Sequence, residues 1–245
     1  MSIRFTLKNT IPVLLLFASS CLLAQKNNTH QNLYWYRLAS TYKTAKNITI
    51  YIEAEQRRFL SNSKINQGLI RTVAKYKWKS GIETGLGFCY FQTYPNDEFY
   101  TEKIYTKELR HYQEVNYTGM IGKYKISERY QCEQRYFGLN QTSQNDWIVR
   151  HRFRLSVERL LYTKNNFNIA LSAWNEVMLN SDKEITVNVF DQNRLGANLS
   201  FILNKNVNLE LSYFKFYLAN TKSTYFFDRN IYRISILTSF GKGIK

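Results

Sequence analysis

The sequence has very little proline and no long apolar run after its N-terminal segment. Only two prolines occur in 245 residues. Because proline cannot donate a ladder hydrogen bond, its scarcity suits long uninterrupted strands. Beyond residue 24, no segment approaches the ~18 consecutive apolar residues of a transmembrane helix. The sequence therefore excludes a helical membrane protein. It leaves open a membrane barrel, in which lipid-facing residues alternate with interior ones along each strand.

Cysteine and histidine are also scarce, with three residues of each. Cys21 lies in the N-terminal segment, which leaves Cys89 and Cys132 in the rest of the chain. By strand parity these two side chains point to opposite faces of a sheet, so we expect no disulfide between them. No His/Cys cluster has metal-site spacing, and we predict neither a metal nor another cofactor.

The first 24 residues have the three-part layout of a secretory signal peptide. Arg4 and Lys8 give a cationic start, and the largely apolar stretch Ile11–Ala24 follows. We predict cleavage after Ala24, so that residues 1–24 are a signal peptide and residues 25–245 form one exported domain. Cys21 is disfavoured as a lipid-modified cysteine because the three residues after it continue the apolar run.

Aromatic and basic residues are abundant. The 19 tyrosines and 16 phenylalanines favour strands and the aromatic girdles of membrane barrels. Expected lipid-facing girdle residues are Tyr34, Tyr36, Tyr76, Trp78, Tyr117 and Tyr213.

The formal net charge is +16, but basic residues are scattered among acidic ones and no nucleic-acid-binding module is present, so we expect no nucleic acid partner. Basic loops suit the phosphates of lipopolysaccharide and other outer-membrane lipids, although they also serve simply as solvated loops.

Strand-like alternation is clearest in Lys107–Phe137, two alternating runs joined by a short glycine-containing turn. One face of the first run carries Glu108, Arg110, Tyr112, Glu114 and Asn116. A row of ionic groups along one face is typical of a strand between a polar interior and lipid. The same pattern predicts eleven strands: Asn32–Tyr42, Asn47–Arg58, Gln67–Lys79, Gly81–Thr93, Lys107–Tyr117, Lys123–Phe137, Asp146–Leu160, Asn166–Leu179, Gln192–Leu203, Asn206–Leu218 and Arg229–Phe240.

A membrane barrel and a soluble sandwich show the same alternation along their strands. The lengths of the connections between the strands distinguish the two folds. Short and long connections alternate along the whole chain, as periplasmic turns and extracellular loops do in outer-membrane barrels. We therefore predict an all-β fold, an antiparallel transmembrane β-barrel of 10–12 strands. Because bacterial single-chain barrels usually have even counts, twelve is the preferred number. Either the twelfth strand is unrecognised, or residues 25–31 thread through the interior, or the strand count is off elsewhere in the chain.

Several blocks give the chain a resemblance to a known family. The blocks that carry it are Leu33–Lys43, Ile50–Phe59, Lys107–Val115, Arg129–Phe137, Arg150–Glu158, Trp174–Asn180 and Phe190–Phe214. Their order and spacing resemble the exported barrel-like family of Gram-negative bacteria catalogued as domain of unknown function 2490. Cys132 departs from the pattern, since an aliphatic residue is expected there. The resemblance implies an outer-membrane barrel with no established activity. Location in the bacterial outer membrane in turn implies barrel-assembly machinery as a partner.

Strand parity predicts an ionic network inside the barrel. Its expected members are Glu108, Arg110, Glu114, Arg129, Glu133, Arg135, Arg150, Arg152, Arg154, Glu158, Glu176 and Arg194. Arginine's planar fork suits paired hydrogen bonds to carboxylates. One interpretation is structural, with ion pairs that join the wall and fill the interior. The other is a narrow passive pore, in which Arg150, Arg152 and Arg154 form a ladder that favours anions.

A lipid-modifying hydrolase or transferase is the alternative from another functional class. Such an enzyme needs a nucleophile and a positioned base. His111 and His151 fall on the lipid-facing parity, whereas Ser127 and Ser156 on neighbouring strands fall on the interior parity. Because no motif supports a pairing between them, we expect a barrel that is not an enzyme and has no catalytic residues.

Overall fold

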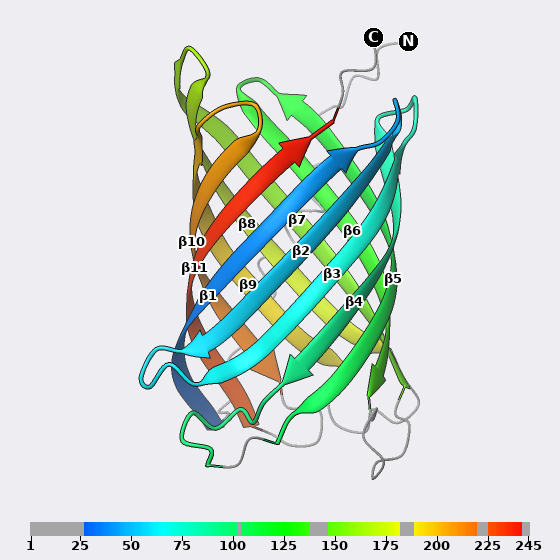
Figure 1. Ribbon diagram of the computed structural model, residues 1–245. Helices are drawn as coiled ribbons and strands as arrows, with labels where there is room; N and C mark the ends of the chain where they lie inside the picture. The colour runs from blue at the N-terminus through cyan, green and yellow to red at the C-terminus, as the bar shows by residue number, and fades with distance from the viewer. Residues whose placement is uncertain (1–26, 102–103, 138–146, 182–188, 220–224, 242–245) are drawn as a thin grey trace, which may run out of the picture.

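The computed structural model describes residues 27–101, 104–137, 147–181, 189–219 and 225–241, which form a closed β-barrel (Figure 1). The predicted signal peptide lies outside these residues. Within them the barrel has eleven strands: β1 (Asn27–Lys43), β2 (Ile48–Phe59), β3 (Ile65–Lys77), β4 (Ile82–Thr93), β5 (Thr106–Ile121), β6 (Tyr124–Phe137), β7 (Trp147–Lys164), β8 (Phe167–Ser181), β9 (Phe190–Ile202), β10 (Val207–Ala219) and β11 (Tyr225–Phe240). Across the same residues, no helix has the length and apolarity needed to span a membrane.

The barrel closes through a parallel pair between β1 and β11. Every other neighbouring pair in the ring is antiparallel, whereas Asn27 to Tyr42 pair in constant register with Tyr225 to Phe240. In an up-and-down barrel with an odd strand count, the first and last strands point the same way, so the closing pair has to be parallel. The preferred count of twelve is therefore wrong for the described residues. Asn27–Gln31 extend β1 instead of threading through the interior.

The alternation of short and long connections is confirmed. Connections after the odd-numbered strands have two to four residues and lie at the upper end of Figure 1, together with the end of β11. The even-numbered strands end at the opposite end of the barrel, and five to twelve residues separate each of them from the next strand. We call these the short-turn end and the long-loop end. The tight turns use left-handed backbone at Gly81 (φ 87°), Gly122 (φ 58°) and Asn165 (φ 53°).

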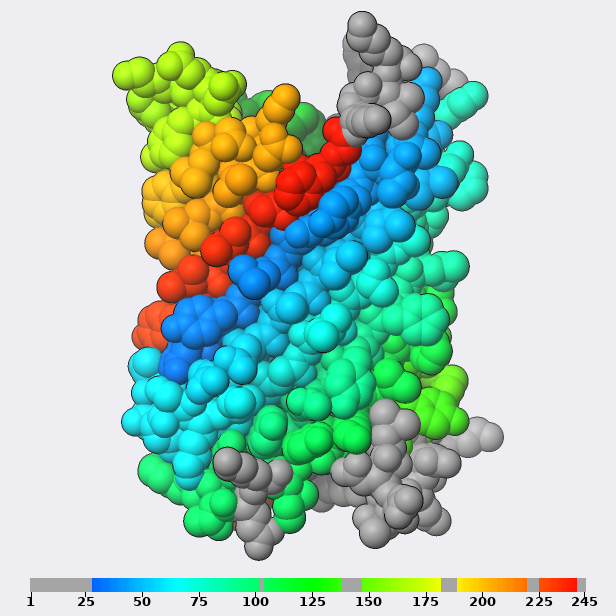
Figure 2. All heavy atoms as spheres, viewed as in Figure 1, coloured from blue at the N-terminus to red at the C-terminus, as the bar shows by residue number. Residues whose placement is uncertain are grey.

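Apolar side chains face outward and polar side chains face inward along the strands, the reverse of a soluble protein. Leu38, Ile70, Leu86 and Phe88 are all more than half exposed on the outer wall. The part of that wall over β11, β1, β2 and β3 faces the viewer in Figure 2. Of the six predicted girdle residues, five are exposed and Tyr34 is half-buried. This inversion is what a barrel surrounded by lipid requires.

Two groups of apolar side chains also point inward. The first comprises Leu33, Trp35, Phe59, Trp174, Phe214, Phe216 and Ile231, and the second comprises Leu69, Val73, Cys89, Phe91 and Tyr112. Trp35 lies against Phe214 and Phe216, with ring centroids 5.1 and 6.2 Å away. Cys89 and Cys132 are both free, as their parity predicts. The interior is therefore filled by rings as well as by charges.

The parallel closure can be tested by cross-linking. Leu38 on β1 pairs with Ile236 on β11, and both are exposed. In a background with the native cysteines replaced by alanine, Leu38→Cys with Ile236→Cys is expected to form a disulfide, because directly paired Cα atoms lie within disulfide range. The cross-linked chain should run faster on a non-reducing denaturing gel after boiling. Leu38→Cys with Ile234→Cys is the out-of-register control, beyond the ~7 Å limit. A twelve-strand barrel would leave the first pair uncross-linked.

Candidate functional site: the ionic network inside the barrel

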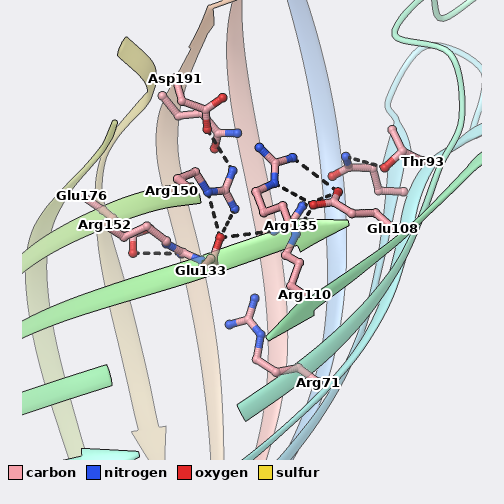
Figure 3. A network of polar contacts seen from close by, with 12 residues as sticks. Arg71, Thr93, Glu108, Arg110, Glu133, Arg135, Arg150, Arg152, Glu176 and Asp191 are labelled. Atoms are coloured by element: carbon pink, nitrogen blue, oxygen red, sulfur yellow. Dashed lines mark hydrogen bonds and ion pairs between the residues drawn. The ribbon is translucent and has the colours of Figure 1, made fainter. Parts of the chain in front are cut away.

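The ionic network lies on the inward face of β5 to β9, where adjacent strands bring charged residues into register. Glu133 on β6 is directly paired with Arg150 on β7. Arg154 on β7 and Arg194 on β9 both pair with Glu176 on β8, which lies between them. Since inward residues recur at every second position, each strand contributes a short ladder of charges. Figure 3 shows Glu133, Arg150 and Glu176 among the charged side chains that converge inside the wall.

Glu133 is the centre of the network. One carboxylate oxygen accepts a hydrogen bond from Arg150 Nε (2.8 Å) and another from Nη2 of the same side chain. The other oxygen accepts from Arg152 Nη1 at 2.6 Å. Arg110 approaches from β5, with its Nη1 3.8 Å from Glu133 Oε2. Glu133 is only 1% exposed, so three guanidinium groups replace the water that its carboxylate loses.

Glu176 is a second centre, joined to the first through Arg152. Its Oε1 atom accepts hydrogen bonds from Arg152 Nη2 (2.9 Å) and Arg129 Nη2 (2.6 Å). Arg194 Nη1 lies 3.9 Å from its Oε2 atom. Arg129 belongs to β6 and Glu176 to β8, so this contact passes over β7. Glu114, on the neighbouring strand β5, is ion-paired with Lys75 of β3 at 2.9 Å.

Glu108 joins the network on its other side. Its two oxygens accept from Arg110 Nε (2.6 Å) and Nη2 (2.8 Å), a bidentate pair within one strand. Arg135 Nε of β6 also donates to Glu108, at 2.6 Å. The Arg110 guanidinium stacks 3.6 Å from the centroid of the Phe91 ring. This geometry holds Arg110 between Glu108 and Glu133 and makes the network continuous from β5 to β9.

Three predicted members lie outside the continuous network. Glu114 is paired with Lys75, as above, and Glu158 with Lys125 at 2.7 Å. Arg154 contacts no carboxylate among the described residues; its guanidinium lies 4.2 Å from the centroid of the Trp174 ring. The structure thus brings nine of the twelve predicted residues into one connected set.

Parity reasoning missed Asp191 and Arg229. Asp191 accepts a hydrogen bond from Arg150 Nη1 at 2.9 Å, which makes it the fourth carboxylate of the network. Met178 pairs with Gln192 and Leu179 pairs with Phe190, so the register shifts by one residue at this point. Asp191 is therefore left without a partner in the strand pairing. A simple two-residue alternation cannot anticipate such a bulge. Arg229 has the same parity as Arg233 on β11, so strand alternation in the sequence already indicates that its side chain points inward.

A smaller group of ion pairs connects the strands around the closure. Arg37 Nη2 of β1 donates to Glu210 Oε1 of β10 at 2.7 Å. Arg233 of β11 lies 3.4 Å from Glu210 and 3.9 Å from Glu55 of β2. The Arg37–Glu210 contact passes over β11 and the Arg233–Glu55 contact passes over β1, whereas Arg233 and Glu210 lie on neighbouring strands. The parallel seam is therefore reinforced from inside by charges of β1, β2, β10 and β11.

A cavity of about 350 Å³ opens beside the network towards the long-loop end. Its wall includes Thr93, Thr106 and Phe137, which lie at the ends of β4, β5 and β6 that face the long loops. Eight arginines from seven strands also line it, against two carboxylates, Glu108 and Asp191. The wall of this cavity is therefore strongly cationic.

The residues considered for lipid chemistry make other contacts. His151 Nδ1 lies 2.9 Å from the hydroxyl of Tyr130, and the His111 ring lies edge-on to Phe88. The Ser127 hydroxyl is 3.3 Å from that of Thr118. Across the described residues no hydrogen bond joins either histidine to Ser127 or Ser156, and no group of three or more His, Cys, Asp and Glu residues is arranged to hold a metal ion.

The fold and its interior define a closed, mostly antiparallel β-barrel with an ionic network inside. Residues 32–226 match the model of the family described as Protein of unknown function (DUF2490), and the chain belongs to that family, as its sequence blocks predicted. No curated protein matches the chain. Among solved structures, the chain is similar to the β domain of the Bordetella autotransporter BrkA, with 13% identity and a TM-score of 0.43 over 73% of this chain and 80% of that one.

Proposed function

We propose that this protein is an outer-membrane β-barrel whose interior is closed by its own side chains and whose role is structural. The outer-membrane location is supported by the inverted polarity of the wall and by the separation of short turns from long loops. A barrel in that membrane contacts lipopolysaccharide and other outer-membrane lipids and is inserted by barrel-assembly machinery. We propose both as partners by location.

The observation that carries the structural role is the continuous network centred on Glu133 and Glu176. Both carboxylates are 1% exposed, and Arg150 and Arg152 between them are 1% and 4% exposed. An open aqueous pore would leave such side chains hydrated. The aromatic cluster around Trp35 meets the network where Arg194 lies 5.7 Å from the Trp35 ring. Charges and rings together fill the middle of the barrel, which favours a closed interior over a narrow anion pore.

Planar-bilayer recording tests this proposal. The folded wild-type barrel, verified by its heat-dependent gel mobility, is expected to give no steady current. The triple variant Glu133→Ala, Arg150→Ala and Arg152→Ala removes three large side chains from the closed section and is expected to conduct. A steady, anion-selective wild-type current that is reduced by Arg152→Glu would contradict the proposal and establish the narrow pore.

A further inference from the structure

The cavity at the long-loop end has a charge imbalance that the ion pairs do not remove. Eight arginines and two carboxylates are the charged residues among those that line it. Four further carboxylates, Glu53, Glu55, Glu133 and Glu176, pair with these arginines from outside the wall. Within the part of the chain that the structure describes, all six carboxylates together leave two positive charges in excess. Isolated charges in an enclosed space are costly, so this excess calls for an anionic partner.

Arg229 is the clearest source of the excess. The residue is 2% exposed and lines the cavity. Its Nε donates to Gln31 Oε1 at 2.8 Å, and its Nη2 to Asn96 Oδ1 at 2.9 Å. Both acceptors are neutral amides, and no carboxylate pairs with Arg229 among the described residues. The amides fix the direction of the guanidinium without neutralising it, which is how a binding arginine is positioned.

Other arginines of the wall have unused hydrogen-bond donors. Within the described residues, the Nε atoms of Arg71, Arg152 and Arg194 are buried and have no hydrogen-bond partner. The Arg152 side chain is 5% exposed, so bulk solvent does not readily serve its Nε. Arg194 reaches its carboxylate, Glu176, at only 3.9 Å. Arg71, Arg152 and Arg194 line the cavity together with Arg229, so their incompletely paired guanidinium groups add to its positive potential.

We propose that this cavity binds a small, multiply charged anion that bears phosphate groups. A volume of about 350 Å³ is within the range of small-molecule sites. Guanidinium forks match phosphate oxygens in pairs, and several arginines around one enclosed space suit more than one phosphate charge. The phosphate groups belong either to a soluble solute or to a lipid headgroup at the membrane surface. The site lies beside the closed section and does not require current to pass.

Titration calorimetry with pyrophosphate tests the site in the folded barrel, in a phosphate-free detergent buffer at low salt. The wild type is expected to bind saturably, at one pyrophosphate per chain. Arg229→Gln should weaken binding by about ten- to a hundredfold, the effect of losing one charge-assisted interaction. Arg194→Gln should weaken it as well.

Arg58→Gln is the matched control. Like Arg229→Gln, it replaces an arginine by glutamine and removes one positive charge, but on β2. Arg58 lies next to Arg57 but on the other face of the strand, where it donates to Gln56 Oε1 and to the Ser63 carbonyl. Its binding should equal that of the wild type. Absence of saturable binding to a heat-modifiable wild-type barrel would overturn the proposal. Equal weakening in Arg58→Gln and Arg229→Gln would do the same, since it would indicate diffuse surface charge.

A competition experiment distinguishes the two sources of phosphate. Lipopolysaccharide in mixed micelles is added to the pyrophosphate complex, with phosphatidylcholine micelles as the reference. Displacement by lipopolysaccharide alone assigns the site to a lipid headgroup, whereas retention of pyrophosphate assigns it to a soluble anion. The bilayer recordings are independent of this result, so failure of the anion site and failure of the closed-barrel proposal give different outcomes.

Discussion

Glu133→Gln is expected to lower the free energy of unfolding by about 3–5 kcal/mol, the usual cost of removing one partner from a buried ion pair. Glu133 is 1% exposed and lies among Arg110, Arg150 and Arg152. The amide keeps the side-chain volume but removes the negative charge, so the three guanidinium groups then repel one another in an enclosed space. Urea unfolding of the refolded barrel in lipid vesicles, followed by tryptophan fluorescence, measures the change.

Glu128→Gln is the matched control for this prediction. Glu128 lies on the same strand, β6, but is exposed. The two variants lose the same charge from the same strand and differ only in the environment of the carboxylate. Because Glu128 lies on the outer, lipid-facing wall, where a charge is unfavourable, the control is expected to be no less stable than the wild type. Similar losses in both variants would show that the interior pairs contribute little, and would remove the physical basis for the closed barrel.

Gly196→Ala is expected to have a comparably large effect, for a steric reason. A Cβ atom on Gly196 would lie 2.2 Å from Phe214 Cβ and 2.6 Å from the Tyr213 carbonyl oxygen. Phe214 lies directly opposite Gly196 on β10, so the backbones of β9 and β10 would have to separate. We expect a loss of about 3 kcal/mol, the upper part of the range for overpacking. The same urea titration measures it.

Gly68→Ala provides the comparison within the same barrel. Gly68 lies inside β3, and a Cβ atom there would meet nothing within 4 Å. Because alanine loses less conformational entropy than glycine in a strand, this variant should be more stable than the wild type by about 0.5–1 kcal/mol. If both variants moved in the same direction, the close contact at Phe214 would not be the cause of the Gly196 effect.

Much of the interior could be predicted from the sequence because side-chain direction in a strand is a local property. Glu108, Arg110 and Glu133 are inward by simple two-residue alternation, and the structure buries all three. Asp191 could not be placed in this way, since the irregularity beside Met178 interrupts the alternation. The partner of Arg129 could not be predicted either. Glu114 and Glu176 both have suitable parity, and only the stagger of the strands brings Glu176 within reach.

Sequence periodicity alone predicted the eleven strands, the face that most of their residues occupy and the separation of short turns from long loops. These features depend on periodicity and turn chemistry over a few residues. Three features are visible only in the folded chain: β1 and β11 close the ring in parallel, nine predicted charges and Asp191 form one network, and eight arginines line the cavity at the long-loop end. Such features depend on how far the wall tilts and staggers before it meets itself, and no short stretch of sequence encodes that distance.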